Sequence, residues 1–317
     1  MLAEIRAACA EVARRSRWVR LDEGGLARFA ETLELASVTA PRYDAAHHYV
    51  GDPEAMLAFN LTLDAVNFGS GYFPHLRKRP GKSGYFTVAL ALKEHFEAHG
   101  PLAPRELVAL TPPRTAALFG QDLGDPVRAE LMRHFTEALH QLGSYLVERF
   151  GGSFAALVAA AQGRAERLAE LLAEMPYFRD VARYGELRVP LYKRAQIAPS
   201  DLALAFDGQG YGHFSDLEQL TIFADNLVPH VLRVDGVLVY DPALVARLEA
   251  GALIPAGSEE EVEIRAVALH AAERLVAQLR AAGEAVSARQ LDVYLWNRGQ
   301  QERYKAAPRH RTRSVFY

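Results

Sequence analysis

The chain has 317 residues, of which 50% are hydrophobic and 24% are charged, and its formal net charge is -3. This length suffices for one large domain or two ordinary ones, and the composition is that of a soluble globular protein. The near balance of acidic and basic residues argues against a general nucleic-acid-binding protein, which usually carries a basic excess. A single cysteine, Cys9, excludes an intrachain disulfide and a cysteine-based zinc site.

The chain also lacks the features of a secreted or membrane protein. Its N-terminal segment has charged residues in every turn and no apolar core of the kind that signal peptides need. The longest apolar run, residues 154–161, is far shorter than the roughly 20 residues that span a bilayer. We therefore expect a soluble, cytoplasmic protein with no membrane partner.

The first third of the chain reads as a series of helices. Apolar residues at three- and four-residue steps predict helices at 2–16, 23–37, 54–65, 86–98 and 104–110. A weaker strand signal lies at Tyr85–Val88. The Pro- and Gly-rich stretch Pro74–Gly84 reads as a loop and not as a domain boundary.

A long helix dominates the middle of the chain. Asp125 and Pro126 have the form of an N-cap and a first helical residue, apolar residues then recur as far as Phe150, and Gly151 ends the pattern. Further helices are predicted at 163–174, 190–206 and 216–225.

The last third continues the helical pattern after one strand signal at Val237–Tyr240. Ser258 with Glu261 three residues later predicts a capping box, which opens a long helix ending near Gly283. A shorter helix begins at Ser287. With no repeat and no low-complexity linker in the sequence, we predict a single, mainly α-helical domain over residues 1–317 with a few short β-strands.

The segment Leu220–Gly236, LTIFADNLVPHVLRVDG, is the most informative one. An apolar, helix-like run carries one carboxylate, Asp225, between Phe223 and Leu227. Burial of a carboxylate is unfavourable unless it is paired or hydrogen-bonded. Asp225 is therefore either a structural group, which caps a helix or pairs with an arginine, or a functional one.

Several common site motifs are absent from the sequence. It contains no GxGxxG after a strand, no Walker loop and no HExxH. The stretch Gly208–Gly212, GQGYG, follows a helix and reads as a loop. Nothing in the sequence calls for a cofactor or a metal ion.

Taken together, four groups of segments make the chain resemble the queuosine salvage family, whose members are queuosine 5′-phosphate N-glycosylases. Their order and spacing extend over most of the chain. The chain departs from the family pattern at Asn226, Leu227, His230, Asn297 and Ala203. The segments are Leu63–Phe68 (LDAVNF) with Gly69–Phe73; Leu191–Leu202 (LYKRAQIAPSDL); Leu220–Gly236 with Val237–Tyr240; and Glu261–Arg265 (EVEIR) with Leu291–Trp296 (LDVYLW) and His310–Tyr317.

The resemblance implies hydrolysis of the N-glycosidic bond of queuosine 5′-phosphate, with release of queuine for salvage into tRNA. Such cleavage passes through an oxocarbenium-like sugar, which an ionised carboxylate near C1′ stabilises. By resemblance Asp225 has that catalytic role and Phe223 stacks on or walls the base. Asp201 is the alternative catalytic carboxylate, ranked lower because Pro199 and Ser200 precede it and N-capping would explain it.

The resemblance also implies residues that recognise the base. Asp292 and Trp296 are four apart and share a helix face. The Asp292 carboxylate suits the amine or diol of queuine, although a solvated face or a pair with Arg289 would also explain it. The family histidine at the base corresponds to His47, with a one-residue ambiguity toward His48.

Other expected substrate-binding residues lie on three segments. Lys193 and Arg194 offer donors to a 5′-phosphate, against the alternative of a solvated charged face. His230 completes the group on the Asp225 segment. Asp64, Asn67 and Phe68 precede the flexible Gly69–Gly71, although a glycine-terminated helix with a buried Phe68 explains them as well.

The implied protein is thus a helical hydrolase, whose bundle is similar to helical DNA glycosylases by analogy only. We expect a small-molecule substrate, no intact nucleic acid and a monomer. Two other hypotheses stay open. One is an N-glycosidase of another purine nucleotide, and the other is a non-catalytic helical protein that binds a nucleoside or nucleic acid.

Overall fold

The structure is a computed structural model that describes residues 1–39 and 41–317. It is mainly α-helical with a few short strands, as predicted. The chain divides into two compact units, each built from segments that are not contiguous in sequence. Unit 1 comprises Met1–Pro41, Asp180–Gln196 and Asp216–Arg313; unit 2 comprises Arg42–Arg179, Ile197–Ser215 and Ser314–Tyr317.

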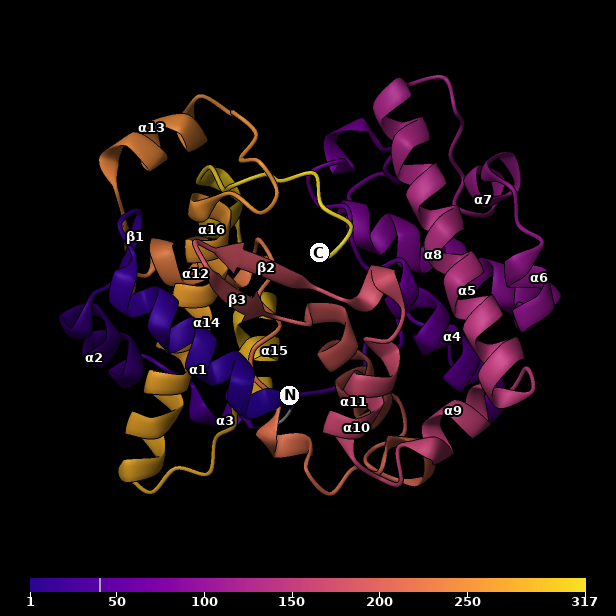
Figure 1. Ribbon diagram of the computed structural model, residues 1–317, viewed down its shortest axis with the longest axis horizontal. Coiled ribbons are helices and arrows are strands. Elements are labelled where there is room, and N and C mark those ends of the chain that lie inside the picture. Colours follow the sequence, from indigo (N-terminus) through magenta and orange to yellow (C-terminus); the bar gives the residue numbers. More distant parts are fainter. Residues whose placement is uncertain (40) are drawn as a thin grey trace. The chain divides into compact units, whose positions relative to one another are not determined.

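The core of unit 1 is helix α14, Glu259–Ala281, which is buried along most of its length. Helix α1, Leu2–Arg15, packs on it with the apolar face of Ile5, Cys9 and Val12 (Figure 1). A helix that is apolar on most sides belongs in a protein interior. The other helices of unit 1 are α2 (Glu23–Glu31), α3 (Leu35–Val38), η4 (Leu217–Gln219), α12 (Val228–Val234), α13 (Pro242–Glu249), α15 (Ala288–Arg298) and α16 (Glu302–Ala306).

Two small antiparallel sheets also belong to unit 1. Strand β1 (Val19–Leu21) pairs with β4 (Leu238–Tyr240), with Arg20 opposite Val239. Strand β2 (Val181–Tyr184) forms a hairpin with β3 (Leu187–Pro190). The predicted strand at 237–240 is therefore confirmed within one residue, whereas the other three strands have no clear signal in the sequence.

Unit 2 is organised around helix α8, Pro126–Phe150, against which α4, α6 and α7 pack (Figure 1). The predicted helix end is confirmed, because Gly151 adopts a left-handed conformation with φ 60°. The other elements of unit 2 are α4 (Pro53–Ala65), η1 (Phe73–His75), α5 (Gly84–His99), α6 (Pro104–Val108), α7 (Pro112–Leu118), α9 (Phe154–Ala160), α10 (Ala165–Leu172), η2 (Pro176–Phe178) and η3 (Gly210–Gly212).

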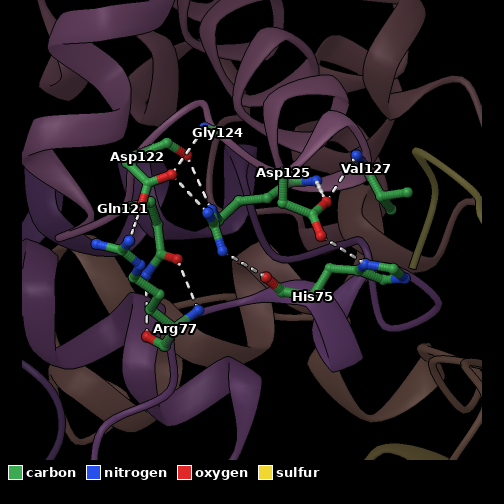
Figure 2. Close-up of polar contacts among 8 residues, drawn as sticks. His75, Arg77, Gln121, Asp122, Gly124, Asp125 and Val127 are labelled. Atoms are coloured by element: carbon green, nitrogen blue, oxygen red, sulfur yellow. Dashed lines mark hydrogen bonds and ion pairs between the residues drawn. The ribbon is translucent and has the colours of Figure 1, made fainter.

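The start of α8 is fixed by the predicted cap, Asp125. Its Oδ1 accepts from the backbone N–H groups of Val127 at 2.8 Å and Arg128 at 2.9 Å, and its Oδ2 lies 3.1 Å from Nδ1 of His75 (Figure 2). The nearby Asp122 carboxylate accepts from the Arg128 guanidinium and from Gly124 N–H. Both oxygens of Asp125 and Oδ1 of Asp122 therefore have hydrogen-bond partners.

Helix α11, Lys193–Ala205, begins in unit 1 and continues in unit 2. Pro199 lies inside it, and Asp201 follows two residues later, well past the helix start. Asp201 is consequently not an N-cap. The reason for placing Asp201 below Asp225 as a candidate catalytic carboxylate was therefore wrong.

The helix predicted at 216–225 was wrong. Only the short η4 turn forms, and residues 220–227 have no regular structure. Side chains from distant segments take the backbone groups that a helix would use: Thr221 N–H binds Gln196 Oε1 and Phe223 N–H binds Asp292 Oδ1. An amide bound in this way cannot also donate within a helix.

Three other predictions needed correction. The strand at Tyr85–Val88 lies within α5, because Ser83 caps that helix by accepting from Phe86 N–H. The helix at 23–37 is interrupted after Glu31. Ser258 caps α14, but Glu261 binds Gly257 N–H, so the reciprocal half of the capping box is displaced by one residue.

Candidate active site

Asp225 lies at the entrance to α12 with one oxygen anchored. Its Oδ1 accepts from the backbone N–H groups of Leu227 at 2.7 Å and Val228 at 2.9 Å. Over residues 1–39 and 41–317, Oδ2 has neither a hydrogen-bond donor nor an ion-pair partner, and the residue is half-buried. The two hydrogen bonds fix the direction of the carboxylate. The result is an oriented carboxylate with one oxygen available for a ligand.

The segment that carries Asp225 is held by side chains from two other helices. Oδ1 of Asp292, on α15, accepts from Phe223 N–H at 2.7 Å. Nε of Arg265, on α14, donates to the Ala224 carbonyl at 2.8 Å. Phe223 is 2% exposed, so its ring is part of a packed wall. These contacts place Phe223, Asp225 and Asp292 in one small region of unit 1.

The two candidate cations on α11 are buried. Lys193 is 5% exposed and Arg194 is 1% exposed. This burial excludes the alternative interpretation from the sequence, in which both side chains lie on a solvated charged face. Lys193 N–H donates to Oδ2 of Asp180 at 3.2 Å. Both cations therefore lie inside unit 1, at the start of α11.

His230 and Trp296 also lie in unit 1. His230 Nε2 is 2.8 Å from the Tyr304 carbonyl oxygen and therefore donates to it. Burial lowers the pKa of His230 to about 4, so the ring is neutral near pH 7. Trp296 is partly exposed, on the same helix as Asp292. Arg289, the residue proposed as a local partner of Asp292, donates to Glu218.

A second group of predicted residues lies in unit 2. His47 Nδ1 is 2.7 Å from Oδ2 of Asp44, its Nε2 is 2.8 Å from the Lys82 ammonium, and its ring stacks on Phe86. His48 Nε2 lies 2.8 Å from the Tyr85 hydroxyl. Burial lowers the pKa of His48 to about 4, which keeps this histidine neutral.

Two predicted carboxylates of unit 2 act on one phenol. Burial raises the pKa of Tyr85 well above its usual range, and the negative charges of Asp201 and Asp64 raise it further. The charges of Asp201 and Asp64 therefore both act on a tyrosine that the sequence did not single out. Asn67 lies two residues beyond the end of α4 and is partly exposed.

Phe68 has a packing role. It is 2% exposed and makes an edge-to-face contact with Phe135, with ring centroids 5.1 Å apart. The alternative explanation from sequence, a buried Phe68 after a helix end, describes this geometry.

One cavity in unit 2 lies apart from the predicted site residues. An open cavity of about 570 Å³ in unit 2 is lined by Phe206, Tyr211, His213 and neighbouring residues, and no predicted site residue is in its wall. Within the described residues, no group of three or more His, Cys, Asp or Glu side chains is placed to hold a metal ion. None of the helices described is long and apolar enough to cross a membrane.

Comparison with known proteins identifies the family. The family model for the queuosine salvage protein matches residues 47–317, so the chain belongs to that family. The resemblance inferred from the four groups of segments is thereby confirmed.

The relatives are similar over most of their length. The queuosine 5′-phosphate N-glycosylase/hydrolase of Sphaerobacter thermophilus is 40% identical over 311 residues, covering 96% of this chain and 95% of the relative. A Bos taurus protein of the same name is 31% identical over 331 residues, with 96% of each chain covered. That of Dictyostelium discoideum is 37% identical over 270 residues, covering 83% of this chain and 79% of the relative.

Proposed function

We propose that this protein hydrolyses the N-glycosidic bond of queuosine 5′-phosphate and releases queuine. Family membership and the names of the relatives support the reaction. The single structural observation that carries the proposal is Asp225, whose Oδ1 is fixed by two backbone N–H groups while Oδ2 is left for a ligand.

The chemistry requires such a carboxylate. Cleavage of the bond develops positive charge on the sugar, which a fixed negative charge near C1′ stabilises. The same oxygen can orient or deprotonate the attacking water. The base is a 7-deazaguanine and has no N7 to protonate, so hydrogen bonds at its other edges must assist its departure. We assign the wall of the base to Phe223 and its polar recognition to Asp292 and Trp296. His47 stays a candidate for base recognition on the resemblance alone.

The remaining candidate residues are assigned to the 5′-phosphate or to weaker contacts with the substrate. Lys193 and Arg194 are the proposed donors to the 5′-phosphate, since both are buried cations at the start of α11. His230 is a weaker candidate for substrate contact, because its Nε2 is bound to a backbone carbonyl. Asp64 and Asn67 stay candidates for substrate binding on the resemblance alone.

A turnover assay tests the proposal. Wild-type protein is incubated with queuosine 5′-phosphate and released queuine is quantified by chromatography. We expect multiple turnovers, and a loss of roughly 10²- to 10⁴-fold in kcat for Asp225→Asn, since loss of a catalytic acid–base group has that effect. No queuine release by the wild type would refute the enzyme hypothesis in favour of a binding protein.

The matched variant Asp201→Asn decides between the two carboxylates. If Asp225→Asn is as fast as wild type and Asp201→Asn is not, the catalytic role moves to Asp201. Guanosine 5′-phosphate, incubated in parallel, tests the alternative of a hydrolase for another purine nucleotide; faster cleavage of it would favour that alternative.

A further inference from the structure

A buried ion pair in unit 1 contacts the Asp225 segment. Arg265 is 2% exposed, and its Nη1 and Nη2 donate to Oδ1 and Oδ2 of Asp180 at 3.1 and 2.5 Å. Its third nitrogen, Nε, donates to the carbonyl of Ala224 at 2.8 Å, one residue before Asp225. The guanidinium fork therefore binds Asp180 along one edge and the candidate catalytic segment along the other.

Asp180 binds the start of α11 in turn. Its Oδ2 accepts from Lys193 N–H at 3.2 Å, and its backbone carbonyl accepts from Leu191 at 2.9 Å and Tyr192 at 3.1 Å. One carboxylate therefore joins Arg265 to the turn that leads into the proposed phosphate-binding cations.

That turn is strained. Tyr192 has φ 48°, a left-handed conformation that is unfavourable for a residue with a bulky side chain. It persists because the two bonds to Asp180 hold the backbone, while Arg188 donates to the Tyr192 hydroxyl at 2.8 Å. Strain of this kind places the next residue, Lys193, in a direction that a relaxed turn would not give.

A second buried link joins the same two segments. Gln196, one turn into α11, accepts from Thr221 N–H at 3.0 Å and donates to its hydroxyl at 3.0 Å. Its amide also donates to Leu191 O at 2.9 Å. Two links therefore join residues 191–196 to residues 221–225. One runs directly from Gln196 to Thr221, and the other runs through Asp180 and Arg265 to Ala224, next to Asp225.

We propose that Arg265, acting through Asp180, is a positioning residue that fixes the Asp225 carboxylate and the Lys193 turn with respect to each other. The proposal rests on the function proposed above for its assignment of Asp225 and Lys193. Arg265 touches neither substrate nor reacting atoms. It sets the spacing between the group that acts on the sugar and the turn that carries the phosphate donors.

The test compares Arg265→Lys with Glu263→Gln. Lysine keeps the buried charge but cannot bind Asp180 and Ala224 O at once. Glu263, also on α14 and fully buried, accepts from the backbone N–H groups of Trp18 and Val19 and from the Tyr184 hydroxyl. Within the described residues, none of its hydrogen bonds goes to 191–196 or 221–225. Both variants remove part of a buried polar network, so both should lower Tm. Only Arg265→Lys should change the spacing between the Asp225 carboxylate and the Lys193 turn.

We expect Arg265→Lys, assayed below its Tm, to lose 10- to 100-fold in kcat and to raise KM for queuosine 5′-phosphate, since displacement by about 1 Å has effects of this size. Asp180→Asn should act in the same direction, and the double variant should be no worse than the poorer single one. Glu263→Gln should keep kcat within twofold. A folded Arg265→Lys protein with wild-type kcat and KM overturns the proposal.

Amide hydrogen exchange gives a readout without turnover. Peptides covering 191–196 and 221–228 should exchange faster in Arg265→Lys than in Glu263→Gln, while peptides covering 17–21 show the reverse. Unchanged exchange in the first two peptides overturns the positioning role. If the wild type releases no queuine, the proposed reaction fails, and the exchange result still decides whether Arg265 fixes the two segments.

Discussion

Asp125 in unit 2 and Asp225 in unit 1 have the same local hydrogen-bond geometry at Oδ1 but differ at Oδ2. In each, Oδ1 accepts from the N–H groups two and three residues later, at 2.8 and 2.9 Å for Asp125 and at 2.7 and 2.9 Å for Asp225. The difference is the other oxygen. Oδ2 of Asp125 is bound to His75 (Figure 2), whereas Oδ2 of Asp225 has no hydrogen-bond partner in the described chain. An aspartate held by two amides through one oxygen can thus present its second oxygen to a ligand, which is what the role proposed for Asp225 requires.

The largest contrast is expected in activity. Asparagine replaces a capping aspartate with little loss, because its side-chain oxygen still accepts from the helix amides. Asp225→Asn should therefore keep its fold and lose roughly 10²-fold or more in kcat, whereas Asp125→Asn should stay within twofold of wild type. Initial rates of queuine release measure both. Equal losses in the two variants would end the distinction between them.

The helix that follows Asp225 contains a histidine that should make stability sensitive to acid. His230 in α12 is buried and its pKa is lowered to about 4, from about 6.5 in the unfolded chain. Because the unfolded chain binds this proton more readily, stability should fall as pH drops from about 6.5 to about 4, by up to about 3 kcal/mol. Urea unfolding at pH 7 and pH 4.5 measures the loss. His230→Gln keeps a donor for Tyr304 O and should reduce it; an unchanged pH dependence would contradict the assignment.

Substitution by alanine should lower Tm at both aspartates to a similar extent, whereas substitution by asparagine should separate the two in kcat. Asp125→Ala and Asp225→Ala each leave two backbone N–H groups without an acceptor, so each should lower Tm by about 2–4 °C. The corresponding asparagine variants should lie within about 1 °C of wild type. Thermal unfolding followed by circular dichroism provides the comparison. A Tm unaffected by Asp225→Ala would mean that the two hydrogen bonds do not anchor that carboxylate.

The smallest effect concerns Asp125 at low pH. The backbone N–H of Arg128, followed by His75, lowers the pKa of Asp125 to about 2. Its contribution to stability is complete above the unfolded value near 3.8 and is lost as pH falls toward 2. The Tm difference between wild type and Asp125→Asn should therefore be constant above pH 4 and shrink below it. A difference that persists at pH 2 would point to another cause.

The elements predicted correctly are those whose signals are local. Asp125 and Ser287 cap the predicted helices, and Gly151 ends one of them, because each acts on amides or carbonyls a few residues away. The segment around Asp225 was misread as a helix because its form depends on Gln196, Arg265 and Asp292, and Asp292 lies 69 positions from its partner Phe223. Periodicity carries no information about such partners.

The same limit applies to the site. Asp225 was identifiable because a lone carboxylate in an apolar run needs an explanation. The matching segment EVEIR contained Arg265, but nothing in its letters showed that it binds Asp180 and Ala224 O. Tyr85 had no signal beyond its place in a presumed strand. Residues that act by orienting others are visible only when the distant segments are placed together.

The interleaved course of the chain has a consequence for its synthesis. Val19 donates to Glu263, 244 positions later, and α1 packs on α14, so the N-terminal helix lacks its main native partner until most of the protein has left the ribosome. Loops of this length close slowly, and apolar surface that waits for its partner is prone to aggregation. The nascent chain must therefore protect the apolar face of α1 through most of translation. Truncation before Glu259 would leave unit 1 without its core helix, α14.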